Sequence, residues 1–145
     1  MPKTDYGIDA PGVIRNLAIV ALAAALLMVF GRHAIPLGLK YSIGYTGGFC
    51  GLEVALMLWT SLKGKRIAAR QVVDRAELDG DARVLDVGCG RGLLLIEAAK
   101  RLRDGRAVGL DIWIAEYLSG IRSAATEANA KAEGVADREE LLDGN

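Results

Sequence analysis

Histidine and cysteine are scarce in this chain of 145 residues. There is one histidine, His33, and there are two cysteines, Cys50 and Cys89. None of these side chains has the spacing of a metal site, and a single histidine argues against zinc centres and Ser-His-Asp catalysis. Cys50 lies in an apolar stretch and Cys89 in a glycine-rich turn, so no disulfide framework is expected. This fits a reducing compartment.

Net charge is also lacking. Lys+Arg and Asp+Glu both total 18, so the formal net charge is zero. A nucleic-acid partner is not expected, because no basic field spans the chain. Hydrophobic residues make up 52% of the sequence, slightly above the range of soluble proteins. Most of this apolar content precedes Leu62, whereas most of the charge follows it.

The first apolar run extends from Asn16 to Gly31 without a charge, between Arg15 and Arg32. It is apolar on all sides, which indicates burial in lipid or deep in protein. As a helix it would measure about 24 Å, against roughly 30 Å for a bilayer core, and the flanking arginines can reach outward. A secretory signal peptide is the alternative, but no small-residue cleavage site follows Phe30.

The second apolar run, residues 41–62, follows a linker that contains Pro36 and Gly38. Small residues four apart allow a neighbouring helix to approach closely; they are Gly44 with Gly48 and Gly47 with Gly51, and the expected counter-surface is Ala18, Ala21 and Ala25. Glu53 interrupts the run near its middle. An ionised carboxylate is costly in lipid, so Glu53 favours a polar partner or an interfacial helix.

A basic cluster follows the second run and consists of Lys63, Lys65, Arg66 and Arg70. Basic residues collect on the cytoplasmic side of membranes. We therefore expect residues 1–65 to form an apolar helical hairpin that anchors the chain in a membrane, with the rest in the cytoplasm. The alternative is a hairpin buried inside a soluble protein.

Residues 66–145 show alternating helix and strand patterns. Helices are expected at 66–78, 93–102 and 119–133, and short apolar strands at 83–87, 107–110 and 139–142. Strands that alternate with helices predict an α/β fold with a Rossmann-like parallel sheet and crossover helices. The expected fold is therefore α/β, preceded by an apolar helical hairpin.

The turn after the first strand carries glycines at 88, 90 and 92. Glycines let the backbone bend sharply and let a ligand approach it. A dinucleotide site would need a third glycine three positions after Gly90, but Leu93 is found there. Asp86 precedes the turn and would repel a pyrophosphate. S-adenosylmethionine has no phosphate, and its ammonium and sulfonium suit a carboxylate. Asp111 ends the second strand, where an acid can accept hydrogen bonds from two ribose hydroxyls.

The segments VLDVGCGRG and VGLDIW resemble the first motif and the acidic second-strand end of class I S-adenosylmethionine-dependent methyltransferases. The resemblance covers roughly residues 66–145. It implies that the methionine part of the cofactor is lined by Asp86, Gly88, Gly90 and Gly92. It further implies that Asp111 binds the ribose and that Ile112 or Trp113 flanks the adenine. Cys89 belongs to the same cofactor-binding turn, as a small residue rather than a nucleophile, because no histidine is placed to activate it.

Two positions depart from the family pattern. Arg91 stands where Thr or Ser is common, and it is expected to reach the cofactor carboxylate or to face solvent. Asn145 takes the place of the acid that contacts the adenine amino group at the end of the third strand. Family members have further strands that carry the substrate pocket. The sequence is therefore expected to be an incomplete chain that does not transfer methyl groups by itself.

Three hypotheses about function follow. The first is a membrane-associated S-adenosylmethionine-dependent methyltransferase whose acceptor the sequence does not name. The second is a non-catalytic membrane or partner-binding protein that retains a vestigial Rossmann half. The third, a nicotinamide-binding protein, is disfavoured by Asp86 and by the missing third glycine.

Overall fold

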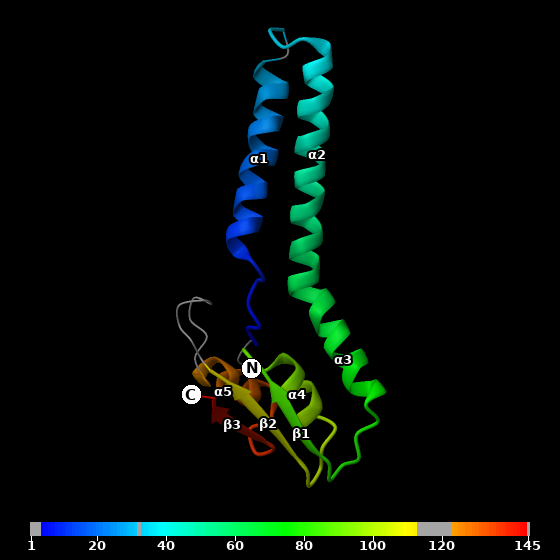
Figure 1. Cartoon of the computed structure of the whole chain (residues 1–145), viewed down its shortest axis with the longest axis vertical. Coiled ribbons are helices and arrows are strands. Elements are labelled where there is room, and N and C mark those ends of the chain that lie inside the picture. The colour runs from blue at the N-terminus through cyan, green and yellow to red at the C-terminus, as the bar shows by residue number, and fades with distance from the viewer. Residues whose placement is uncertain (1–3, 32, 113–122, 145) are drawn as a thin grey trace. The chain divides into compact units, whose positions relative to one another are not determined.

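The computed structural model describes residues 4–31, 33–112 and 123–144. The chain divides into two compact units, whose elements are labelled in Figure 1. One is a helical unit, Ile8–Gly64, and the other is an α/β unit that comprises Met1–Gly7 and Lys65–Asn145. The division falls between Gly64 and Lys65. In addition, the start of the chain groups with the α/β unit rather than with the hairpin.

The helical unit consists of two long helices. Helix α1 spans Pro11–Phe30 and begins with a proline, whose fixed φ suits the first helical position. It ends where the N–H of Gly31 donates to the Leu27 carbonyl at 2.9 Å. Helix α2 spans Leu37–Trp59 and continues into a short π-helix, η1, at Thr60–Gly64. The two apolar runs thus form the expected helical hairpin.

The close approach of α1 and α2 depends on a missing side chain. A Cβ added to Gly47 would lie 2.6 Å from the Cβ of Ala24, which is buried. Gly47 therefore provides the small-residue contact that the sequence predicts. Ala24 lies nearest to the added Cβ, and the carbonyl oxygen of Ala21, one of the predicted counter-surface residues, lies 3.8 Å from it. Gly48 and Gly51 have no heavy atom within 4 Å of an added Cβ.

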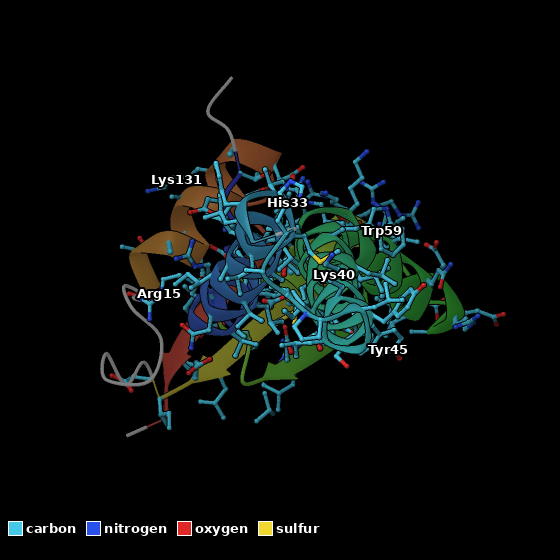
Figure 2. All side chains as sticks on the ribbon, turned by 90° about the horizontal axis from the view of Figure 1, so that it is seen from above. Arg15, His33, Lys40, Tyr45, Trp59 and Lys131 are labelled. Atoms are coloured by element: carbon cyan, nitrogen blue, oxygen red, sulfur yellow. The ribbon has the colours of Figure 1, made fainter. Side chains whose placement is uncertain are left out.

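Among the helices in the described ranges, α1 alone has the length and apolar composition to cross a membrane. Its mean hydropathy over 18 residues is 2.4, and 6% of that window is buried. Core helices of soluble proteins and signal sequences also meet the length and composition criteria. Side chains along the hairpin project outward, and Tyr45 and Trp59 on α2 are examples (Figure 2).

The α/β unit alternates helices with parallel strands. In chain order its elements are α3 Lys65–Arg75, β1 Arg83–Val87, α4 Leu93–Ala99, β2 Arg106–Asp111, α5 Ser123–Glu133 and β3 Glu139–Asp143. The sheet has the order β1-β2-β3, and both strand pairs are parallel. The predicted fold class is confirmed. Helices α3 and α4 differ from their predicted ends by up to three residues, and residues 119–122 of the third predicted helix lie outside the described residues.

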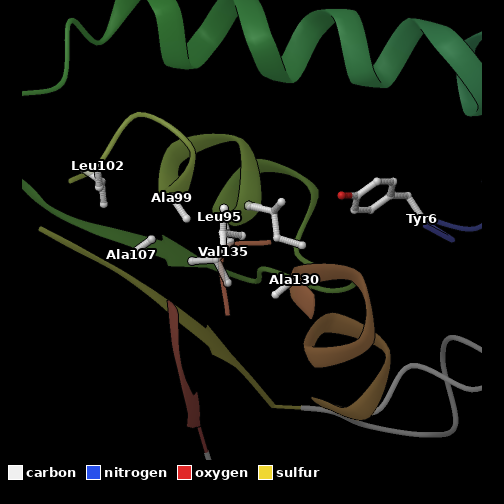
Figure 3. Packing of buried hydrophobic residues seen from close by; sticks show 8 residues of the cluster. Tyr6, Leu95, Ala99, Leu102, Ala107, Ala130 and Val135 are labelled. Atoms are coloured by element: carbon white, nitrogen blue, oxygen red, sulfur yellow. The ribbon is translucent and has the colours of Figure 1, made fainter. Parts of the chain in front are cut away.

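The core of the α/β unit lies where α4 and α5 pack on the sheet. Leu95 and Ile96 of α4 are fully buried, together with Leu102 and Val135. Small residues, Ala99, Ala107 and Ala130, fill the space between the helices and β2, and Tyr6 completes the same cluster (Figure 3). A residue from the first ten of the chain is therefore part of this core.

One edge of the sheet stays open in the described part of the chain. Strand β1 pairs only with β2 there, and its residues Leu85 and Val87 are 59% and 71% exposed. Apolar strands of parallel sheets are usually covered on both faces.

Candidate functional site

The candidate site lies at the carboxyl ends of β1 and β2, the edge at which open α/β sheets bind ligands. The loop Gly88–Gly92 joins β1 to α4. Its three glycines have φ values of +76°, +55° and +76°, a region that L side chains rarely adopt. The loop is therefore the sharp turn that the glycine spacing predicts.

Gly92 is needed for packing as well as for the turn. A Cβ added there would overlap Cγ2 of Thr126 on α5. Thr126 is fully buried, and its hydroxyl donates to the carbonyl of Gly90 at 2.7 Å. One side chain of α5 therefore both holds the loop and excludes any side chain at position 92.

Asp86 lies near the end of β1, and its carboxylate reaches across to α4. Its Oδ2 accepts a hydrogen bond from the N–H of Leu95, the third residue of α4, at 3.1 Å. Burial raises the pKa of Asp86; the Leu95 N–H lowers it, and the nearby charge of Asp111 raises it. A cation at this position would offset the electrostatic cost of both carboxylates.

Asp111 ends β2 and turns its carboxylate to the glycine loop. Its Oδ2 accepts a hydrogen bond from the N–H of Gly90 at 2.7 Å. Two acidic groups therefore lie close together at this edge: Asp111 bonds to the glycine loop, and Asp86 bonds to the first turn of the helix that follows the loop. This arrangement gives the mouth of the loop a negative character, which suits a ligand with positive groups.

Cys89 contributes little chemistry to the loop. The thiol is buried, and its Sγ would lie 2.8 Å from a Cβ added at Gly109 of β2. Burial, followed by the charges of Asp86 and Asp111, raises the pKa of the thiol to about 12. This disfavours the thiolate near neutral pH, and with it a role for Cys89 as a nucleophile.

The predicted adenine region is partly described. Ile112 follows β2 directly and is exposed, and its Cγ2 lies 3.1 Å from a Cβ added at Gly144. This places Ile112 beside the carboxyl end of β3. Trp113 and Asn145, the other two residues predicted for this region, lie outside the described residues.

Sequence reasoning missed two polar residues of α5 that hold the loop. Thr126 and Asn129 are 0% and 3% exposed, and they donate to the carbonyls of Gly90 and Arg91, respectively. They are three residues apart, so they share one face of the helix. The available signal was this pair of polar residues on an otherwise alanine-rich helix face.

No model of a known protein family matches the chain. Among solved structures, it is similar to YjhP from E. coli, with a TM-score of 0.43 and 21% identity over 52% of this chain. It is also similar to cofactor-bound Rv0187 from MTB, with a TM-score of 0.36 and 26% identity over 63% of this chain. The matches cover 28% of YjhP and 50% of Rv0187, so this chain spans half or less of each.

Proposed function

We propose that this chain binds S-adenosylmethionine and acts in S-adenosylmethionine-dependent methyl transfer. The observation that carries the proposal is the pair of carboxylates at the carboxyl ends of parallel strands: Asp111 bonds to the glycine loop, and Asp86 bonds to the first turn of α4 directly after it. S-adenosylmethionine carries an ammonium and a sulfonium, and both cations are stabilised by nearby carboxylates. Its ribose offers two hydroxyl donors to a strand-end acid.

The same carboxylates disfavour a nicotinamide cofactor. A pyrophosphate at the loop would face Asp86, whose carboxylate is half-buried and close to a second acid. Like charges at short range destabilise each other, more so when partly buried. Leu93, where the dinucleotide pattern has glycine, starts α4 directly. A ligand with positive charge and no phosphate fits this loop better.

Each part of the cofactor has its proposed residues. The methionine part is held by Asp86, Gly88, Cys89, Gly90 and Gly92, with Cys89 contributing through its main chain. Asp111 binds the ribose hydroxyls, Ile112 and Trp113 flank the adenine, and Asn145 meets its amino group. In the reaction, a nucleophile of the acceptor attacks the sulfonium methyl, the methyl–sulfur bond breaks, and S-adenosylhomocysteine leaves. The contribution of these residues is binding and orientation.

The cofactor class can be tested by competition. We expect S-adenosylhomocysteine to bind the purified full chain in detergent, as measured by calorimetry, and NAD not to displace it. The matched control is Gly90→Asp, because Gly90 has φ +55° and its N–H bonds to Asp111; this variant should bind neither ligand. Displacement by NAD at comparable concentration would contradict the proposal.

We further propose that the hairpin anchors the chain in a membrane, with the α/β unit in the cytoplasm. Support comes from the hydropathy of α1, its low burial, and the exposed aliphatic side chains along it. Aromatic residues Tyr41 and Trp59 lie near opposite ends of α2. They are separated by about 27 Å of helix, close to the roughly 30 Å hydrocarbon core, where aromatic belts form.

Carbonate extraction of membranes tests the anchor. We expect the protein to stay in the membrane pellet, and the variant Leu22→Lys/Leu26→Lys to be released. Both leucines are exposed on α1, so the packing with α2 is spared, while each lysine raises the insertion cost by about 2.5–3.5 kcal/mol at a helix centre. Release of the unmodified protein into the soluble fraction would contradict an integral hairpin.

A further inference from the structure

The segment Thr4–Gly7, which we name the N-terminal strap, is fastened to α5 by a buried amide. Asn129 accepts a hydrogen bond from the N–H of Asp5 at 2.8 Å and donates to the carbonyl of the same residue at 2.9 Å. This two-bond pairing resembles that between strands. Asn129 is almost completely buried, so both bonds are shielded from water and are costly to leave unmade.

The same amide also holds the glycine loop. Its Nδ2 donates to the carbonyl of Arg91 at 3.0 Å, and one turn earlier Thr126 donates to the carbonyl of Gly90. A single buried side chain, Asn129, therefore joins the strap to the loop, and a shift of either one must break a bond of the other.

A charged pair makes the second connection. Nη1 of Arg91 lies 2.6 Å from Oδ2 of Asp5. The N–H of Gly7 and the Arg91 guanidinium lower the pKa of Asp5, so this carboxylate is ionised near neutral pH. Gly7 has φ +71°, and a Cβ added to it would lie 3.3 Å from Nε of Arg91. The strap thus fixes the direction of a cation on the glycine loop.

Helix α3 fastens the other end of the strap. Nζ of Lys65 donates to the carbonyls of Tyr6 and Gly7 at 2.8 and 2.7 Å. The Arg66 guanidinium lies 5.0 Å from the centre of the Tyr6 ring, within reach of a cation–π contact. Two members of the basic cluster, which the sequence places against a membrane surface, are therefore engaged with the strap.

We propose that the strap is a positioning element of the cofactor site, in which Asp5 and Asn129 hold Arg91 for the carboxylate of the ligand's amino-acid part. The proposal rests on the proposed function. The loop N–H groups of Gly88, Gly90 and Gly92 already have acceptors within the protein. Within the described loop, Arg91 supplies a cation for an anionic group, and its Nη1 lies 2.6 Å from the Asp5 carboxylate.

Two ligands separate this role from a general effect on the fold. S-adenosylhomocysteine carries the amino-acid part. 5′-Methylthioadenosine keeps the adenine, ribose and sulfur but lacks the ammonium and the carboxylate. In the full chain in detergent, we expect Asp5→Ala and Asn129→Asp to raise the Kd of S-adenosylhomocysteine about 5- to 10-fold, which corresponds to about 1–1.4 kcal/mol. The Kd of 5′-methylthioadenosine should change less than about twofold.

The matched control is Asp137→Ala. Asp137 is 78% exposed and pairs with Arg138, whereas Asp5 is 77% exposed and pairs with Arg91; the control should leave both affinities unchanged. The charge exchange Asp5→Arg/Arg91→Asp should not restore S-adenosylhomocysteine binding, because it places an anion where the ligand carboxylate needs a cation. Equal losses for both ligands, or unchanged affinities in Asp5→Ala and Asn129→Asp, would overturn the positioning role alone. An unmodified chain that binds neither ligand would overturn the proposed function and the positioning role with it.

Discussion

Replacing Gly92 by alanine is expected to destabilise the α/β unit by about 2–5 kcal/mol. Two causes add. The left-handed φ of +76° at this position costs an L residue about 1–2 kcal/mol. The new methyl would overlap Cγ2 of the fully buried Thr126, and forcing extra atoms into a packed core costs about 1–3 kcal/mol. Denaturant unfolding of the full chain in detergent, followed at the α/β unit by hydrogen exchange, measures the sum.

Two other substitutions separate these causes. Gly134 has φ +72° and open space around an added Cβ, so Gly134→Ala should show the backbone cost alone. Thr126→Ser removes Cγ2 but keeps the hydroxyl that bonds to Gly90. In that background, Gly92→Ala should cost no more than Gly134→Ala. Strictly additive losses for Gly92→Ala and Thr126→Ser would show that the overlap with Thr126 does not matter.

The strands and the turn were predictable because their signals are local. Arg83–Val87 is a short apolar run followed by three alternate glycines, and the strand β1 and the loop appear at those residues. Asp86 and Asp111 could be placed near each other because the ends of adjacent parallel strands share one edge. The register confirms this, since Val87 pairs with Leu110, the residue before Asp111.

The strap was not predictable because it depends on contacts between residues that are 58 to 124 positions apart. Asp5 and Asn129 are 124 positions apart, and nothing in the sequence around Asp5 marks it as a partner of α5. The place of Tyr6 in the core of the α/β unit was equally unpredictable. From the sequence, an isolated aromatic residue before an apolar helix is assigned to the same unit as that helix. The contacts of the basic cluster were not predictable for a related reason: composition predicts where charge is, whereas packing decides that Lys65 bonds to strap carbonyls.

Asp111→Ala is expected to have the largest effect on the cofactor site. The proposed ribose contact comprises two hydrogen bonds to a charged acceptor, each worth about 1.5–3 kcal/mol. The loss of both would lower the affinity for S-adenosylhomocysteine by roughly two to four orders of magnitude. Part of this loss comes from the protein itself, because the N–H of Gly90 loses its acceptor at 2.7 Å.

The variant Asp111→Asn separates the affinity that is lost with the ribose contact from the affinity that is lost with the Gly90 hydrogen bond. The asparagine oxygen can still accept from Gly90, but the charge and one acceptor are gone, so the affinity should fall to a value between those of the unmodified chain and Asp111→Ala. Asp143 is the matched control, because it ends β3 directly opposite Asp111 in the register; Asp143→Ala should cost less than about threefold in Kd. Calorimetry on the full chain measures all three variants. Unchanged affinity in Asp111→Ala, or an equal loss in Asp143→Ala, would remove the ribose role from Asp111.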